Sequence, residues 1–171
     1  ERLTSWELGR KSHWDSALTG SSCLRAAVMR SFMDELAVLG GRSTAAIYYD
    51  LAKFYDHISL ALLIPRAYAH GYPIHLLAIG MLAHTSPIRL RIGKSVSRTI
   101  KVSSSIRAGC TQANSLAREA LHELLDKSHR AFGPTVLHWS HVDDIVQRAE
   151  HEQKNRLLGT LYEAAKYLIR G

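Results

Sequence analysis

Apolar and polar residues follow two different rhythms along this chain, and these rhythms predict where helices and strands lie. Between residues 24 and 39 apolar side chains recur three or four positions apart, the spacing of one face of a helix, and Gly40-Gly41 follow as its C-cap. The run STAAIYYDL (43–51) is short, apolar and aromatic, which is typical of a buried strand ending at Asp50. Residues 1–20 have no clear period and predict no element.

The middle of the chain predicts two helices and then a hairpin. Ser59 can cap a helix that runs to about His70, bent at Pro65 and stopped by Gly71 and Pro73. A second helix is expected from Ile74 to about His84. The tract 87–106 then alternates apolar and polar residues around Gly93-Lys94, as the two strands of a hairpin do.

The last third predicts helix, hairpin and helix. Asn114 or Ser115 can cap a helix with apolar positions at Ala117, Leu121, Leu124 and Leu125. Two apolar runs, 134–139 and 145–149, flank a turn at 140–144. An amphipathic helix is expected from about Glu152 to Ile169. Strands and helices are mixed without regular βαβ units, so the pattern favours an α+β fold with an antiparallel sheet backed by helices.

Composition restricts the class of protein. A chain of 171 residues with 46% hydrophobic residues suits one compact domain or part of a larger one. Cys23 and Cys110 form no disulfide framework and no metal-ligand spacing, which suits a reducing compartment. No apolar run is long enough to cross a bilayer, and no signal peptide is visible. We therefore expect an intracellular protein, nuclear or cytoplasmic, neither secreted nor bound to a membrane.

The net charge of +7 is unevenly distributed. From His57 to Arg118 there is no Asp or Glu, while eight basic residues occur, namely Arg66, Arg89, Arg91, Lys94, Arg98, Lys101, Arg107 and Arg118. A surface field of one sign attracts polyanions such as nucleic-acid backbones. A generic basic surface is an equally common explanation.

Adjacent carboxylates at Asp143-Asp144, between apolar residues of an expected hairpin, need compensation by a metal, an arginine or solvent. If their hairpin neighbours the strand that ends at Asp50, three carboxylates converge at one sheet edge. Mg²⁺ prefers such oxygen ligands, and two Mg²⁺ ions about 4 Å apart support in-line phosphoryl transfer. The plain alternative is an exposed turn with two solvated acids.

Three stretches together carry more information than any one of them: YYDLAKFYDHI, IRAGCTQANSLA and SHVDDIV, in this order. They resemble motifs A, B and C of reverse transcriptases, nearest to those of non-LTR retrotransposons and group II introns. Motif A has the form Asp-x-x-Lys-x-aromatic-Asp, which Asp50, Lys53, Tyr55 and Asp56 reproduce. Gln112 matches the glutamine of motif B, and Asp143-Asp144 match motif C. The resemblance covers nearly the whole chain.

The resemblance implies a palm-like sheet with motif A at 48–58, motif B at 106–117 and motif C at 139–146. Residues 1–44 would be part of the fingers and a connecting helix, and residues 45–171 the palm. It implies RNA-directed DNA polymerisation, a nucleotidyl transfer with two Mg²⁺ ions, for which Mn²⁺ can substitute. The partners would be an RNA template, a DNA primer and deoxynucleoside triphosphates. The thumb, the remaining fingers and any nuclease segment would belong to a longer polyprotein.

The same resemblance assigns roles to single residues. Asp50, Asp143 and Asp144 would be catalytic and would bind the metals, with Asp144 in a supplementary role, and the carbonyl of Leu51 would complete one coordination shell. Tyr55 would be the steric gate that selects deoxynucleotides, although a core aromatic is equally compatible with its spacing. Gln112 would lie near the nucleotide or would simply be a polar residue at a helix entry.

The remaining assignments concern cations. Lys53 would bind a phosphate, or pair with Asp56 as the simpler alternative. The basic hairpin would contact nucleic-acid phosphates without reading sequence, through Arg89, Arg91, Lys94, Arg98, Lys101 and Arg107.

The chain departs from the family pattern at four positions, one of which is Ser115, where a proline usually precedes the leucine. Thr111 and Ala113 flank Gln112 where Pro and Gly are usual, and His141 replaces the aromatic residue of motif C. A Cβ at Ala113 would be costly if its φ were positive.

Two other functions remain compatible with the residues. One is a catalytically inactive palm-like module that binds nucleic acid, which the basic tract would serve equally well. The other is a two-metal nuclease, which leaves motif B unexplained. A zinc site is not supported, because His138 and His141 lack cysteine partners at ligand spacing.

Overall fold

The computed structural model describes residues 2–18, 20–102, 104–107 and 109–170, and the chain forms two compact units. The first contains the residues up to Gly9 together with Ala52–Ala120. The second contains Arg10–Leu51 and the residues from Leu121 on, so that the long helix α6 (Ala113–Phe132) contributes to both. Helices and small antiparallel sheets confirm the expected α+β class. The division into fingers (1–44) and palm (45–171) stays a prediction.

A three-stranded antiparallel sheet is the centre of the second unit. It consists of β1 (Ser43–Tyr49), β4 (Val136–His141) and β5 (Asp144–His151), in the order β1-β5-β4. Every residue of β1 has a partner on β5, from Ser43 opposite His151 to Tyr49 opposite Ile145. The second predicted hairpin is thus confirmed as β4 and β5, and the strand before Asp50 lies next to it.

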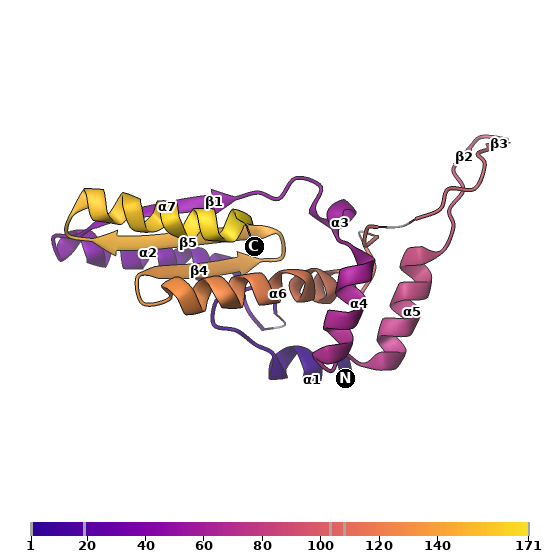
Figure 1. Cartoon of the computed structure of the whole chain (residues 1–171), viewed down its shortest axis with the longest axis horizontal. Helices are drawn as coiled ribbons and strands as arrows, with labels where there is room; N and C mark the ends of the chain where they lie inside the picture. Colours follow the sequence, from indigo (N-terminus) through magenta and orange to yellow (C-terminus); the bar gives the residue numbers. More distant parts are fainter. Residues whose placement is uncertain (1, 19, 103, 108, 171) are drawn as a thin grey trace. The chain divides into compact units, whose positions relative to one another are not determined.

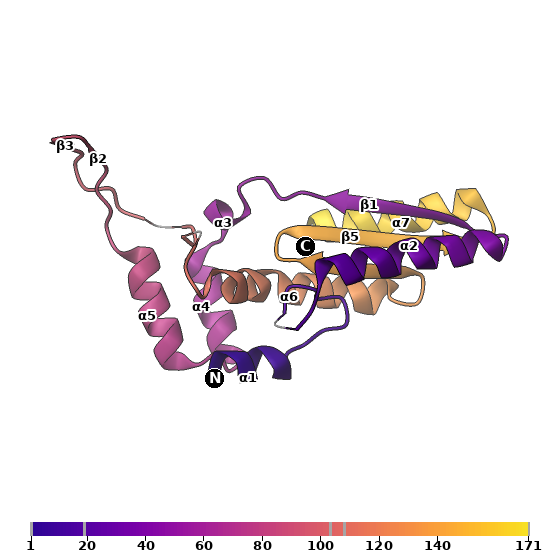
Figure 2. The ribbon, with the colours of Figure 1, turned by 180° about the vertical axis from the view of Figure 1, so that it is seen from behind.

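Helices cover the two faces of this sheet. Helix α7 (Lys154–Arg170) lies against one face and α2 (Cys23–Leu39) against the other (Figures 1 and 2). The apolar stripe of α7 packs on small strand residues and forms a core of Val136, Ala149, Leu157, Leu161 and Ala164. This confirms the predicted amphipathic helix at the end of the chain, because one face is buried and the other is solvated.

Helix α2 is attached to the sheet in a different way. The helix and its glycine C-cap are as predicted, with Gly40 at the cap and Gly41 at φ +75°. Its apolar stripe does not face the sheet, however, since the residues that define it are between 49% and 83% exposed: Leu24, Val28, Phe32, Leu36 and Leu39. The face toward the sheet is narrow and contains the fully buried Ala37.

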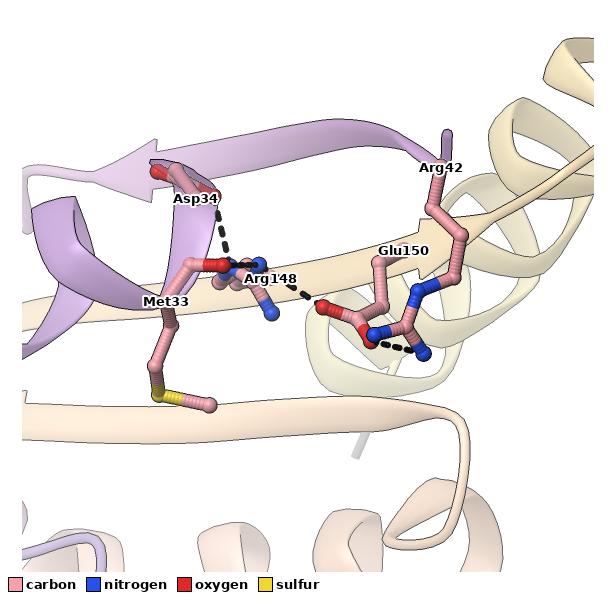
Figure 3. A network of polar contacts seen from close by, with 5 residues as sticks. All are labelled: Met33, Asp34, Arg42, Arg148 and Glu150. Carbon is pink, nitrogen blue, oxygen red and sulfur yellow. Dashed lines mark hydrogen bonds and ion pairs between the residues drawn. The ribbon is translucent and has the colours of Figure 1, made fainter. Parts of the chain in front are cut away.

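A buried arginine on β5 makes polar contacts with α2 (Figure 3). Arg148, only 1% exposed, donates from Nε to Asp34 at 2.7 Å and from Nη2 to the carbonyl of Met33 at 3.1 Å. It also pairs with Glu150 at 2.9 Å, and Glu150 in turn pairs with Arg42 at 2.8 Å. A buried guanidinium is tolerated because its donors find acceptors, and here they lie on α2 and on β5 itself.

The first unit is mainly helical. It contains α1 (Arg2–Gly9), α3 (Phe54–His57), α4 (Leu60–Ala69), α5 (Ile74–Thr85) and the start of α6. The helices around α4 and α5 are confirmed with their predicted ends, whereas α1 and the four-residue α3 were not predicted. Ser59 occupies the N-cap of α4 without a capping bond from its side chain, and α6 begins at Ala113, just before the expected cap.

The predicted basic hairpin follows α5 in this unit. Strands β2 (Arg91–Ile92) and β3 (Ser95–Val96) pair around a two-residue turn that begins with Gly93 at φ +60°. A further pairing between Ile88 and Ile100 continues the ladder toward α5. The hairpin extends beyond the end of α5 as an arm (Figure 1). Among the helices in the described ranges, none is long and apolar enough to span a membrane.

Candidate active site

The structure places the expected carboxylates at one end of the β1-β5-β4 sheet. Asp50 directly follows Tyr49, the last residue of β1, whose partner on β5 is Ile145. Asp144 is the residue before Ile145 and pairs on its other side with His141 of β4. Opposite residues of antiparallel strands project to the same face, so Asp50 and Asp144 are neighbours one step beyond the last β1-β5 pair. Positions 50 and 144, separated by most of the chain, therefore meet.

The hairpin between β4 and β5 is tight and strained. Its two loop residues are Val142 and Asp143, and Val142 has φ +61°, whereas Asp143 is not among the residues with positive φ. This is the φ pattern of a type II′ turn, whose first central residue is normally glycine. A β-branched residue in the left-handed region costs of the order of 1–3 kcal/mol and is most often found at functional sites.

A hollow of about 410 Å³ lies on the second unit at this end of the sheet. It is lined from β1 and the residue after it by Tyr48, Tyr49 and Asp50, and from the hairpin by Trp139, Ser140, His141, Asp144, Ile145 and Val146. The lining is completed by Ser16, Cys23 and Arg30. Asp50 and Asp144 thus both border the hollow, and Asp143 is not among its lining residues.

The acids are accessible to solvent and ligands. Asp50 and Asp144 are exposed and Asp143 is half-buried. Within the described residues none of the three carboxylates has a hydrogen bond or an ion pair, and no arginine neutralises them. Their charges are therefore open to compensation by solvent or by a bound cation.

The donor set at this edge suits one kind of metal. Among the described residues, no group of three or more His, Cys, Asp or Glu side chains is arranged to hold an ion. Mg²⁺ nevertheless needs few protein ligands, because it is usually bound by one or two carboxylates, with water and substrate phosphates completing the octahedron. Asp50 and Asp144, accessible and with oxygen donors only, fit that requirement.

His141 is fixed by the N-terminal segment of the second unit. Residues 14–16 run beside β4, where Ser140 donates its N–H to the carbonyl of Trp14 at 2.7 Å and accepts from Ser16 at 2.8 Å. The Nδ1 of His141 donates to the carbonyl of Ser16 at 3.2 Å. The imidazole that replaces an aromatic residue in the third motif thus borders the hollow as an oriented polar group.

Sequence reasoning missed the cationic side of the hollow. Arg30 projects from α2, and its guanidinium carbon lies 5.7 Å from the centre of the Trp139 ring, within the range of a cation–π contact. Cys23 and Arg30 are seven residues apart and therefore share a helix face. This periodicity was available in the sequence, but the apolar stripe on the opposite side of α2 is the stronger signal.

The other residues of the first motif have local contacts. Leu51 follows Asp50 in the second unit, while Lys53 belongs to the first unit and has a left-handed backbone at φ 52°. Within the described ranges no ion pair joins Lys53 to Asp56, which instead accepts a hydrogen bond from Ser105 at 3.4 Å. Tyr55 donates its hydroxyl to Asn114 Oδ1 at 2.8 Å.

Gln112 is part of the core of the first unit. It is buried, and its Oε1 accepts the Tyr72 hydroxyl at 3.0 Å. Gly80 of α5 gives this amide its space, since a Cβ there would lie 3.0 Å from the same oxygen. Ala113, the first residue of α6, is not among the described residues with positive φ, so the expected cost of its Cβ does not arise.

The basic tract lies in the first unit, and most of its cations are exposed. Arg89, Arg91, Lys94, Arg98 and Lys101 are solvent-exposed on or near the arm. Arg107 is half-buried and donates to the carbonyl of Ser86 at 2.6 Å, while Arg118 is buried and lies 3.5 Å from Glu7. Five of the six residues expected to contact nucleic acid are therefore available to do so.

Comparison with known proteins adds no further constraint. No protein-family model matches the sequence, and no curated protein shows detectable similarity to it.

Proposed function

We propose that this chain is a reverse transcriptase-like palm that catalyses RNA-templated DNA synthesis at the end of the β1-β5-β4 sheet. The observation that carries the proposal is the meeting of Asp50 and Asp144 on one hollow, next to a strained two-residue hairpin. A pair of acids from distant motifs, exposed and without protein partners, is suited to a divalent cation. Several classes of reaction use such a metal site, and the order of the three motifs favours nucleotidyl transfer among them.

Each residue of the site has a role that follows from its position. The carboxylates of Asp50 and Asp144 would hold Mg²⁺, with the carbonyl of Leu51 as a further oxygen donor. Mg²⁺ bound there would activate a primer hydroxyl and stabilise the charge that develops on the transferred phosphoryl group. The strained turn at Val142 fixes the start of β5, and with it the direction of Asp144. The roles of Tyr55, Gln112 and Lys53, which belong to the first unit, stay predictions.

The resemblance and the geometry differ over the third motif. By resemblance Asp143 would be the metal ligand and Asp144 supplementary, whereas Asp144 is the one that borders the hollow with Asp50. We expect the Asp50→Asn and Asp144→Asn variants to lose at least a hundredfold in rate. A larger loss in Asp143→Asn than in Asp144→Asn would reverse the two assignments.

The experiment is incorporation of a single deoxynucleotide on an RNA template with a DNA primer, in Mg²⁺ and in Mn²⁺. The isosteric Asp→Asn changes remove a charge without changing side-chain size, and Asp126→Asn on α6 serves as a matched control away from the hollow. Activity that is unchanged in Asp50→Asn and Asp144→Asn would refute the proposal. Binding of the template–primer without any acid-dependent incorporation would favour the inactive nucleic-acid-binding module.

A further inference from the structure

The hollow beside Asp50 and Asp144 has a cationic wall as well as an acidic one. Arg30 of α2 lines it together with the two acids, and Cys23 at the first turn of the same helix also borders it. Within the described residues Arg30 has no carboxylate partner, and its guanidinium contacts the Trp139 ring. The guanidinium of Arg30 and the carboxylates of Asp50 and Asp144 thus border the same hollow without forming an ion pair.

We propose that Arg30 binds a phosphate group of the ligand that enters this hollow. Stacking on an aromatic ring orients a guanidinium while leaving its N–H donors available, and these donors match phosphate oxygens in a bidentate way. The N-terminus of α2 adds a partial positive charge on the same side. The acids bind a cation, and the arginine binds the anion that accompanies it.

The position of Arg30 is held by the network around Arg148. Arg148 bonds Asp34 and the carbonyl of Met33, one turn further along α2, and so fixes the helix against the sheet. The volume of about 410 Å³ is of the size that accommodates a nucleotide-sized ligand. The inference rests on the proposed function for the identity of the phosphate, which belongs either to an incoming nucleoside triphosphate or to a nucleic-acid backbone.

Cys23 provides a probe that reports occupancy without requiring catalysis. We would measure its rate of alkylation by iodoacetamide with site-resolved mass spectrometry, in each case relative to the rate without ligand. One set of samples contains a Mg²⁺–deoxynucleoside triphosphate, and the other contains a template–primer with a dideoxy end. The ligand that protects Cys23 at the lower concentration identifies the source of the phosphate.

The variants test the arginine itself. Arg30→Met should raise the concentration needed for half-protection about tenfold, the effect expected from losing a charge-assisted hydrogen bond of about 1.4 kcal/mol. Arg25→Met removes the same charge from an exposed position of α2 outside the hollow and should change protection less than twofold. Arg30→Lys, which keeps the charge and the stem, should give an intermediate loss and carries the test if the methionine variant does not fold.

Two results would overturn the inference. One is the absence of ligand protection at Cys23 in the native sequence, and the other is equal weakening by Arg30→Met and Arg25→Met, which would indicate only a general field. Failure of the polymerase proposal looks different. In that case phosphate protection would still depend on Arg30, while nucleotide incorporation would not depend on Asp50 or Asp144.

Discussion

At the scale of residues, the second unit contains a buried polar cluster that makes its stability depend on pH. His138 is 1% exposed on β4, and its Nε2 accepts from Gln147 at 3.1 Å and lies 2.9 Å from Ser128 Oγ. Burial and the neighbouring His129 lower the pKa of His138 from 6.5 to about 4. A proton on Nε2 would also oppose the amide N–H of Gln147, which favours a neutral ring with Nε2 unprotonated in the folded state.

The sign of the pH dependence follows from this lowered pKa. The unfolded chain takes up the His138 proton near pH 6.5 and the folded chain only near pH 4, so acid favours unfolding between these values. The contribution to stability is complete above pH 6.5 and decreases as the pH falls toward 4. Burial and His129 also lower the pKa of His13, which adds to the effect in the same direction.

The test is the free energy of unfolding in urea at several pH values from 7 to 4. We expect the decrease toward acid to be smaller in His138→Gln, which keeps hydrogen-bonding groups without a titrating ring. His75→Gln, at an exposed position of the first unit, is the matched control and should retain the full pH dependence. An identical pH dependence in His138→Gln and the native sequence would contradict this account.

At the scale of elements, Arg148 makes a polar attachment of α2 to the sheet. Its apolar stripe is exposed, so Arg148, Asp34 and the Met33 carbonyl form its polar connection to β5. Arg148→Met keeps an apolar stem of similar length but leaves these acceptors without their donor. We expect a loss of about 2 kcal/mol, below the range for a fully buried pair because Asp34 is partly solvated.

Hydrogen exchange measures this attachment directly. In Arg148→Met the amides of α2 should exchange faster, while those of α7, which packs through apolar residues, should change little. Arg156→Met on the exposed face of α7 is the control for loss of one charge. Unchanged protection of α2 would show that contacts other than the Arg148 network hold the helix.

The basic arm makes a second prediction at this scale. Arg89→Glu, Arg91→Glu and Lys94→Glu together should weaken binding of a template–primer and reduce the slope of log K against log[salt] by about 2–3, because three phosphate contacts are lost. Reversal of three exposed cations of α7, Lys154, Arg156 and Arg170, provides a control with the same change in net charge. Equal effects in both triple variants would show that only total charge matters.

Periodicity predicted most elements but not how they pack. The alternation around Gly93-Lys94 and the apolar run before Asp50 gave a hairpin and a strand where the structure has them. The stripe on α2 predicted a helix correctly, yet its packed face depends on Arg148 of β5, more than a hundred residues away. Local spacing contains no information on such a contact. α1 and α3 are too short to give a clear period.

The candidate site was predictable only in part for the same reason. The motifs mark Asp50 and Asp143 as metal ligands and Asp144 as a supplementary acid, whereas the strand pairing explains why Asp50 lies next to Asp144. The cationic wall at Arg30 depends on the placement of α2 against the sheet. Gln112 was marked by its motif, but the motif does not show that its side chain is buried. That burial against Tyr72 results from the packing of the first unit.

At the scale of the whole molecule, charge is divided between the two compact units. The acid-free tract from His57 to Arg118 lies entirely within the first unit, and the carboxylates of the hollow lie in the second. The central claim concerns the second unit alone, namely that Asp50 and Asp144 share a divalent cation.

Titration with Mn²⁺, followed by paramagnetic broadening of backbone amide signals, tests this claim most directly because it needs neither substrate nor activity. We predict that residues 49–51 and 143–145 broaden first, and that Asp50→Asn combined with Asp144→Asn abolishes this effect. Glu152→Gln combined with Glu163→Gln, two exposed acids elsewhere in the second unit, should leave it intact. Broadening that begins at other acidic residues, or that persists in the Asp50→Asn and Asp144→Asn double variant, would contradict the account.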